Sequence, residues 1–112
     1  MNKTLEQYDS AFAKCRTLFC NKTKDYGTSW RVLRPKSLTD QLFIKAQRIQ
    51  TLEENKHSKV GEGIEPEFIA LVNYAVIGLI QLGLDKMQPL ELTESEALEH
   101  YVQQEEKIKQ TA

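Results

Sequence analysis

The chain has 112 residues, of which 40% are hydrophobic and 28% are charged, with three prolines and five glycines. A chain of this length fits one domain with a modest core, and this composition is typical of a globular protein rather than a disordered or fibrous one. Its formal net charge of −1 argues against nucleic acid as a partner, because nucleic-acid-binding proteins usually carry a basic patch or stripe.

Four helices are predicted in chain order. The first runs from about residue 4 to residue 22, where one face repeats apolar residues at helical spacing: Leu5, Tyr8, Phe12, Cys15 and Phe19. Residues 24–35 contain Gly27, Pro35 and the only tryptophan, which predicts an ordered loop that can include one short helical turn. The segment Ser37-Leu38-Thr39-Asp40 has the spacing of a capping box, so a second helix is expected to begin there and to run to about residue 54.

The third helix is predicted to begin around Pro66, a residue favoured at the first helical position, and to end before Gly83. It is apolar on nearly all sides, which predicts the central helix of the domain. Its apolar run, residues 68–84, is shorter than the roughly 20 residues that span a membrane, and it includes Asn73, Tyr74 and Gln81. We therefore expect a buried core helix and no membrane association.

The fourth helix is predicted to begin at a second capping box, residues 93–96, and to end near Gln110, with Glu105 on its surface. Within it, Leu98-Glu99-His100-Tyr101 echoes Leu5-Glu6-Gln7-Tyr8 at an offset of 93 residues. Two interpretations are open: residues 93–112 begin a truncated second repeat, or two amphipathic helices match by coincidence. In both, residues 1–112 form a single helical domain.

The start of the chain and its cysteines indicate a cytoplasmic protein. The opening MNKTLEQYDS has neither the basic n-region nor the apolar h-region of a secretory signal. The only cysteines, Cys15 and Cys20, fall on different faces of one predicted helix and are expected to stay reduced. Neither histidine has zinc-site spacing to them.

Five of the cations within residues 24–48 could bind a polyphosphate, because ammonium and guanidinium groups donate charge-assisted hydrogen bonds to phosphate oxygens. Three flank Trp30 and two share a face of the second helix: Lys24, Arg31 and Arg34, then Lys45 and Arg48. A solvated basic face without any ligand explains the same pattern.

Four carboxylates are candidate ligands for Mg²⁺, a cation that prefers oxygen: Asp40, Glu62, Glu65 and Glu67. Carboxylates at a helix start also complement the helix dipole with no metal present. Asn73 and Tyr74 lie inside the most apolar helix, where a buried amide needs hydrogen-bond partners. They could form the wall of a site or an interhelical hydrogen-bond seam.

Three segments occur in a recognisable order: Lys24-Asp25-Tyr26-Gly27 with Trp30, then Ile44-Lys45-Ala46-Gln47-Arg48-Ile49, then Glu62-Gly63-Ile64-Glu65 followed by Asn73-Tyr74-Ala75. Over about residues 5–82 they resemble the nucleotide-modification-associated family, formerly called a domain of unknown function. That family is similar to the MazG-like all-α NTP pyrophosphatases, and some of its members look like tandem copies.

The resemblance implies a MazG-like, four-helix bundle that binds a nucleotide through Mg²⁺ and cleaves it between the α- and β-phosphates. It implies that Lys45 and Arg48 contact phosphates, that Tyr26 and Trp30 border the base, and that the metal ligands come from Glu62, Glu65 and Glu67. A homodimer is also expected, because a small bundle with one very apolar helix gains core by pairing.

Two positions depart from the family pattern. Related sequences carry acidic residues where this chain has Ile44 and Ala70. Without those carboxylates a two-metal hydrolytic site is incomplete. Two hypotheses follow: a nucleotide-binding domain with pyrophosphohydrolase activity, or a non-catalytic helical module for interaction or dimerisation.

Overall fold

The computed structural model describes residues 2–33, 35–54, 60–84 and 92–111, without the side chains of residues 2, 32, 35 and 60–62. Over these residues it contains four α-helices and no strand: α1 (Asn2–Tyr26), α2 (Pro35–Glu54), α3 (Val60–Gly83) and α4 (Glu94–Thr111). A short 3-10 helix, η1 (Ser29–Val32), lies between α1 and α2. The prediction of an all-α, bundle-like fold is confirmed.

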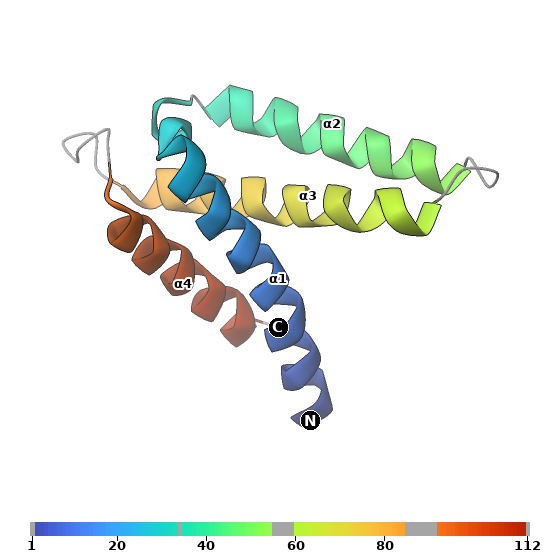
Figure 1. Cartoon of the computed structure of the whole chain (residues 1–112), viewed down its shortest axis with the longest axis horizontal. Coiled ribbons are helices and arrows are strands. Elements are labelled where there is room, and N and C mark those ends of the chain that lie inside the picture. Colours follow the sequence, from blue (N-terminus) through green and yellow to red (C-terminus); the bar gives the residue numbers. More distant parts are fainter. Residues whose placement is uncertain (1, 34, 55–59, 85–91, 112) are drawn as a thin grey trace.

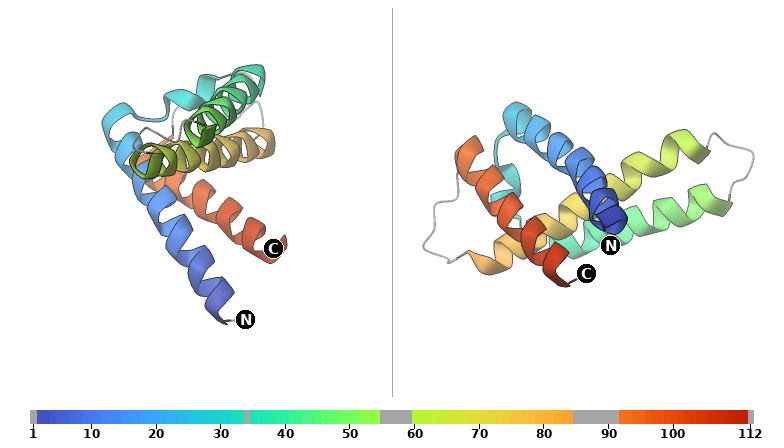
Figure 2. Two further views of the ribbon diagram at one scale, coloured as in Figure 1. Left: turned by 90° about the vertical axis from the view of Figure 1, so that its right-hand side faces the viewer. Right: turned by 90° about the horizontal axis from the view of Figure 1, so that it is seen from below.

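The helices form two antiparallel pairs that cross (Figure 1). One pair is α2 with α3, and the other is α1 with α4, which packs across α3 (Figures 1 and 2). Because α3 contacts all three other α-helices, it is the central helix, as its sequence predicts.

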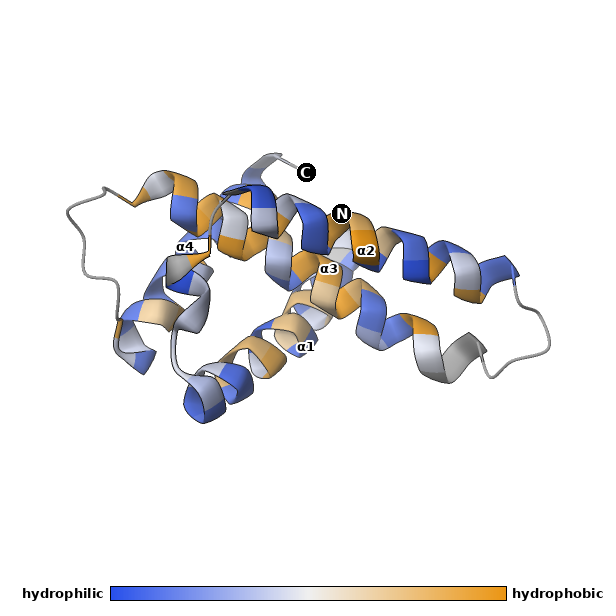
Figure 3. Ribbon diagram, turned by 90° about the horizontal axis from the view of Figure 1, so that it is seen from above, coloured by the Kyte–Doolittle hydropathy of each residue, from blue (hydrophilic) through white to orange (hydrophobic). Residues whose placement is uncertain are grey.

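The core lies where the two helix pairs cross. Phe19 of α1 packs there against Tyr101 of α4 and Trp30 of η1, with ring centroids 4.6 and 6.2 Å apart. Val76 and Ile80 of α3 are almost completely buried against them. The buried members of this core come mainly from α1, α3 and α4, whereas α2 contributes Leu38. Hydrophobic and hydrophilic residues are interspersed along the sides of the helices that Figure 3 shows.

Helices α1 and α2 are longer than predicted, and their ends have local causes. α1 continues to Tyr26 and stops because Gly27 adopts a positive φ of 68°, with its N–H donating to the Thr23 carbonyl at 2.8 Å. The loop predicted around Trp30 does include a short helical turn, which is η1. α2 begins at Pro35 rather than at Ser37, because proline is well suited to the first helical position.

The prediction that α3 begins at Pro66 is wrong. The helix begins at Val60, and Pro66 lies inside it. Pro66 is the seventh residue of the helix, beyond the first turn, where a proline removes one backbone hydrogen bond and its ring crowds the carbonyl four residues earlier; the helix nevertheless continues through it. Gly61 and Gly63, a residue type that disfavours a helix interior, are helical residues.

The capping box of α4 is confirmed. The Thr93 N–H donates to Glu96 Oε1 at 2.9 Å, and the Glu96 N–H donates to Thr93 Oγ1 at 3.1 Å. The hydrogen bonds with Thr93 lower the pKa of the Glu96 carboxyl. The helix ends at Thr111, one residue from its predicted end.

The expectation that Glu105 is a surface residue is wrong, because Glu105 is only 3% exposed. Arg16 of α1 donates to its carboxylate at 2.6 Å, which allows the charge to be buried. A second ion pair joins the same two helices, between Lys109 of α4 and Asp9 of α1. Arg16 of α1 and Lys109 of α4 are equivalent positions under the offset of 93 residues. Each of the two cations contacts an acidic residue on the other helix. The second-repeat interpretation stays a prediction.

α3 is central but is not buried all round. Its segment Gly63–Gly83 is long and apolar enough to cross a membrane by length and composition, and only 22% of its most apolar window is buried. The faces toward the other helices are covered, whereas Phe68, Leu79 and Leu82 are exposed on the remaining side. The expectation of a fully buried helix therefore holds for the packed faces only.

Candidate functional site

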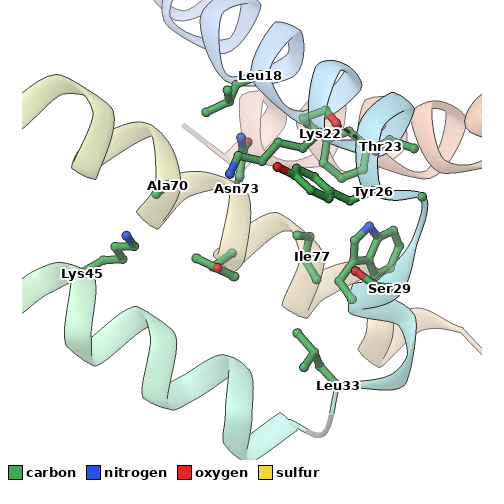
Figure 4. A pocket seen from close by; sticks show the side chains of 14 residues that line it. Leu18, Lys22, Thr23, Tyr26, Ser29, Leu33, Lys45, Ala70, Asn73 and Ile77 are labelled. Carbon is green, nitrogen blue, oxygen red and sulfur yellow. Dashed lines mark hydrogen bonds between the residues drawn. The ribbon is translucent and has the colours of Figure 1, made fainter.

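A pocket of about 390 Å³ opens where the end of α1, η1, the middle of α3 and α2 meet (Figure 4). This volume lies in the range of small-molecule sites. Most of its lining is apolar, including Leu18, Leu33 and Ile77. Two lysines also line it: Lys22 extends from α1, and Lys45 points from α2 toward α3 (Figure 4).

The aromatic side of the pocket is formed by Tyr26 and Trp30, the two residues expected to border a base. Tyr26 is in the last turn of α1 and its ring is largely exposed. Trp30 is only 9% exposed, and its indole Nε1 is buried with no hydrogen-bond partner among the described residues. An unpaired buried donor is costly, so an acceptor is missing at this point.

η1 is held against α3 by Gln81. The Gln81 amide nitrogen donates to the carbonyls of Trp30, Arg31 and Leu33 at 3.1, 2.8 and 3.3 Å. In return, the Arg31 guanidinium donates to Gln81 Oε1 at 2.7 Å. Arg31 is therefore buried, and its side chain helps to hold η1 against α3. It does not line the pocket, although its sequence position predicts a phosphate ligand.

The other predicted cations lie in different places. Lys45 and Arg48 both approach Glu67, at 3.3 and 3.4 Å, and of these three only Lys45 lines the pocket. The contact of Lys45 with the buried Glu67 Oε2 is an ion pair without hydrogen-bond geometry. Lys24 is exposed in the last turn of α1, outside the pocket lining, and Arg34 lies outside the described residues.

The predicted metal ligands do not gather at one point. Glu67 is paired with the two cations of α2, Glu65 is paired with Lys14 of α1 at 3.1 Å, and Asp40 is exposed on α2. The Glu62 side chain lies outside the described part of the structure. Among the described side chains, no group of three His, Cys, Asp or Glu could hold a metal ion, so these carboxylates do not fit a Mg²⁺ site. Magnesium stays a prediction.

Asn73 forms a buried seam between three helices. Its Nδ2 donates to the Cys15 carbonyl of α1 at 3.0 Å, and its Oδ1 accepts from the Tyr101 hydroxyl of α4 at 2.8 Å. Burial raises the pKa values of the Tyr101 phenol and the Cys15 thiol, so both stay protonated at neutral pH. Asn73 also lines the pocket together with Tyr74, so both of the roles left open for Asn73 apply to it.

The two departures from the family pattern are structurally different. Ala70 of α3 lines the pocket, so an acidic residue at this position would face the ligand space. Ile44 is exposed on α2 and is not part of the lining. The missing carboxylate that bears on the pocket is therefore the one at position 70.

Sequence reasoning missed Lys22 and Ser29 as pocket residues. Lys22 lies one turn before Tyr26, so the two share a face of α1 once the helix is known to reach residue 26. Ending the helix at residue 22 concealed that relation. Ser29 carries no spacing signal, because its position depends on the path of η1.

A family model described as Nucleotide modification associated domain 1 matches residues 22–82. The match begins at Lys22 and ends after Gln81, so it spans most of the pocket residues but not α4. No curated protein and no solved structure matches the chain.

Proposed function

We propose, from the premise that this chain belongs to the Nucleotide modification associated domain 1 family, that its pocket binds a nucleotide. The base lies against Tyr26 and Trp30, and the phosphates lie toward Lys22 and Lys45. The observation that carries the proposal is that one pocket, lined mostly by the matched segment, combines aromatic rings, among them Tyr26 and Trp30, with two lysines from different helices.

The aromatic side of the pocket suits a nucleobase. Base–aromatic stacking contributes about 1–3 kcal/mol per base and tolerates any base. The ring of Tyr26 is exposed to the ligand space, and the indole N–H of Trp30 has no acceptor among the described residues. Carbonyl and ring-nitrogen acceptors of a base can accept from this N–H once the indole turns toward the pocket.

The lysine side of the pocket suits phosphate. Lys22 is exposed and forms no ion pair with the described residues, so its ammonium is available to an anion. Lys45 shares Glu67 with Arg48, which leaves one net positive charge on this group of three. A phosphate can therefore bind Lys45 without displacing its partner, and charge-assisted hydrogen bonds supply the affinity.

Hydrolysis of a nucleoside triphosphate with Mg²⁺, as in the MazG-like enzymes, is the finer part of the proposal. The described carboxylates do not fit a metal site, and position 70 presents a methyl group to the pocket. These observations support binding more strongly than catalysis. We therefore propose nucleotide binding as the primary function and treat pyrophosphohydrolysis as an activity to be tested separately.

Binding is testable through intrinsic fluorescence, because Trp30 is the only tryptophan and lines the pocket. Titration with nucleoside mono-, di- and triphosphates is expected to change its emission saturably. Lys22→Ala should weaken binding about 10- to 100-fold, the range for losing a hydrogen bond to a charged group. Lys24→Ala is the matched control, since it removes the same charge two residues away, outside the pocket.

The outcomes separate binding from chemistry. Saturable binding that depends on Lys22 and not on Lys24 supports the proposal, whereas no response to millimolar nucleotides would refute it. Equal weakening by both variants would indicate a diffuse charge effect rather than a site. Pyrophosphate release with Mg²⁺ is then compared between the native chain and Ala70→Asp, which returns an acidic side chain to the pocket wall.

A further inference from the structure

One face of α3 carries an apolar stripe, formed by Phe68, Val72, Ala75, Leu79 and Leu82, in which Val72 is partly buried against the core and the other four residues are exposed. The positions follow one another at spacings of four, three, four and three residues, the heptad pattern of helices that pair. Phe68 is 46% exposed and Leu82 is 77% exposed. No charged residue occurs between Phe68 and Gly83, so the stripe has nothing that favours water.

We infer that this stripe is a homodimer interface, in which α3 of one copy packs antiparallel against α3 of a second copy about a two-fold axis near Ala75. A second copy supplies the same heptad spacing by identity. In this arrangement Phe68 faces Leu82 of the other copy and Val72 faces Leu79, since the midpoints of both pairs lie within one residue of position 75. A small residue at the axis allows the helix backbones to approach closely.

A groove beside the stripe supports a helix from a second copy as the occupant. It lies between α1 and α3, has a volume of about 390 Å³, and is lined by Ala11, Lys14, Phe68 and Val72 among others. The antiparallel register places Leu82, the most exposed large apolar residue of the described chain, at this end of the partner. The groove therefore offers a hole for the most prominent knob of the stripe.

The size of the interface requires the groove as well as the stripe. The stripe is about 22 Å long at 1.5 Å per residue, whereas a stable interface usually buries about 800 Å² per partner. A single helix stripe of that length is too small, and the α1 side of the groove extends it. The prediction concerns assembly and does not depend on nucleotide binding, because the pocket is on another side of α3.

A lipid surface is the main alternative occupant. A lipid-facing helix needs an apolar face but no heptad spacing, and it usually has lysines or arginines along its polar side. The polar side of α3 instead carries Asn73 and Gln81, which are hydrogen-bonded inside the chain. These features favour a second copy over a membrane.

The test is the mass of the purified chain in solution by light scattering after size-exclusion chromatography. We expect twice the monomer mass of 12.9 kDa at micromolar concentrations. Leu82→Lys is expected to give a monomer that keeps its helical circular dichroism. Phe43→Lys is the matched control, because Phe43 is a 63% exposed apolar residue of α2 outside the stripe, and it should leave the dimer intact.

A cross-link tests the register. Ala75→Cys places two thiols near the proposed axis, so oxidation should link two copies much faster than with Phe43→Cys. The proposal is overturned if the native chain is a monomer at about 100 µM, if Phe43→Lys dissociates the dimer as fully as Leu82→Lys, or if both cysteine variants cross-link equally. A monomer that binds phosphatidylcholine–phosphatidylglycerol vesicles would assign the stripe to lipid instead.

Discussion

The hydrogen-bond seam through Asn73 should contribute measurably to stability. Tyr101→Phe removes the hydroxyl that donates to Asn73 Oδ1 at 2.8 Å and leaves that buried acceptor without this donor. An unsatisfied buried group costs about 1–3 kcal/mol, and we expect a loss of about 1–2 kcal/mol because the ring remains in place. For a domain of this size, that corresponds to a fall of roughly 4–8 °C in Tm.

The pairwise origin of that loss can be measured with a double-mutant cycle. Asn73→Ala should cost about 2–4 kcal/mol, because it removes both hydrogen bonds and leaves a void. Once Asn73 is gone, Tyr101→Phe removes a hydroxyl that has already lost its partner. The second substitution should then cost about 1 kcal/mol less than it does in the native chain.

Urea unfolding followed by helical circular dichroism is the assay, with the m-value checked for two-state behaviour. Tyr8→Phe is the matched control, since the Tyr8 ring packs on Phe12 and its hydroxyl makes no hydrogen bond with the described residues. It should change stability by less than about 0.5 kcal/mol. Equal effects of the two Tyr→Phe substitutions, or additive effects in the cycle, would refute the seam.

Three further predictions concern charges. Because burial raises the pKa of Tyr101, the unfolded chain loses the phenol proton before the folded chain does as pH rises above about 10. The free energy of unfolding should therefore fall there by up to about 1.4 kcal/mol per pH unit. In alkaline unfolding curves, Tyr101→Phe should lack the fall that this phenol causes. Arg16→Met should cost about 1–2 kcal/mol in urea unfolding, less than for a fully buried pair because Arg16 is 35% exposed, whereas Arg16→Lys should retain part of the contact with Glu105. Thr93→Ala should lower the free energy of unfolding by about 1 kcal/mol, because it removes the helix cap. Because the pKa of Glu96 is lowered in the folded chain, the native cap should weaken as pH falls below about 4. Acid unfolding followed by circular dichroism should show less of this dependence in the variant.

The helices were predictable because their signals are local. Apolar spacing located α1, an apolar run located α3, and capping boxes located α2 and α4, with the start of α4 placed to within one residue. The errors arose where two local signals compete. Glycines at 61 and 63 indicate a loop, but they are helical in α3, and Pro66 was assigned to a helix start although it lies inside the helix. The packing of α3 on α2 outweighs these local preferences, of which the one against an interior proline is the larger.

The site was less predictable, because it depends on pairings between distant segments. Tyr26, Trp30, Lys45 and Asn73 were identified from the sequence and do line one pocket. Arg31 was grouped with the phosphate ligands because it is a cation near Trp30, but its partner is Gln81, fifty residues away. Glu105 was assigned to the surface because most glutamates are, and only the packing of α4 on α1 shows Arg16 beside it.

The composition of α3 is explained by its three neighbourhoods. One face, with Val76 and Ile80, packs in the core; a second, with Ala70 and Tyr74, lines the pocket; the outer stripe, with Leu82, is uncovered. The hydropathy of the sequence is high on all three faces, so it predicts an apolar helix but not which face packs in the core, lines the pocket or stays uncovered. If the faces act separately, Leu82→Lys should abolish pairing of copies and leave the nucleotide-dependent change in Trp30 emission unaltered. A loss of both properties in that variant would mean that the pocket is formed correctly only in the assembled protein.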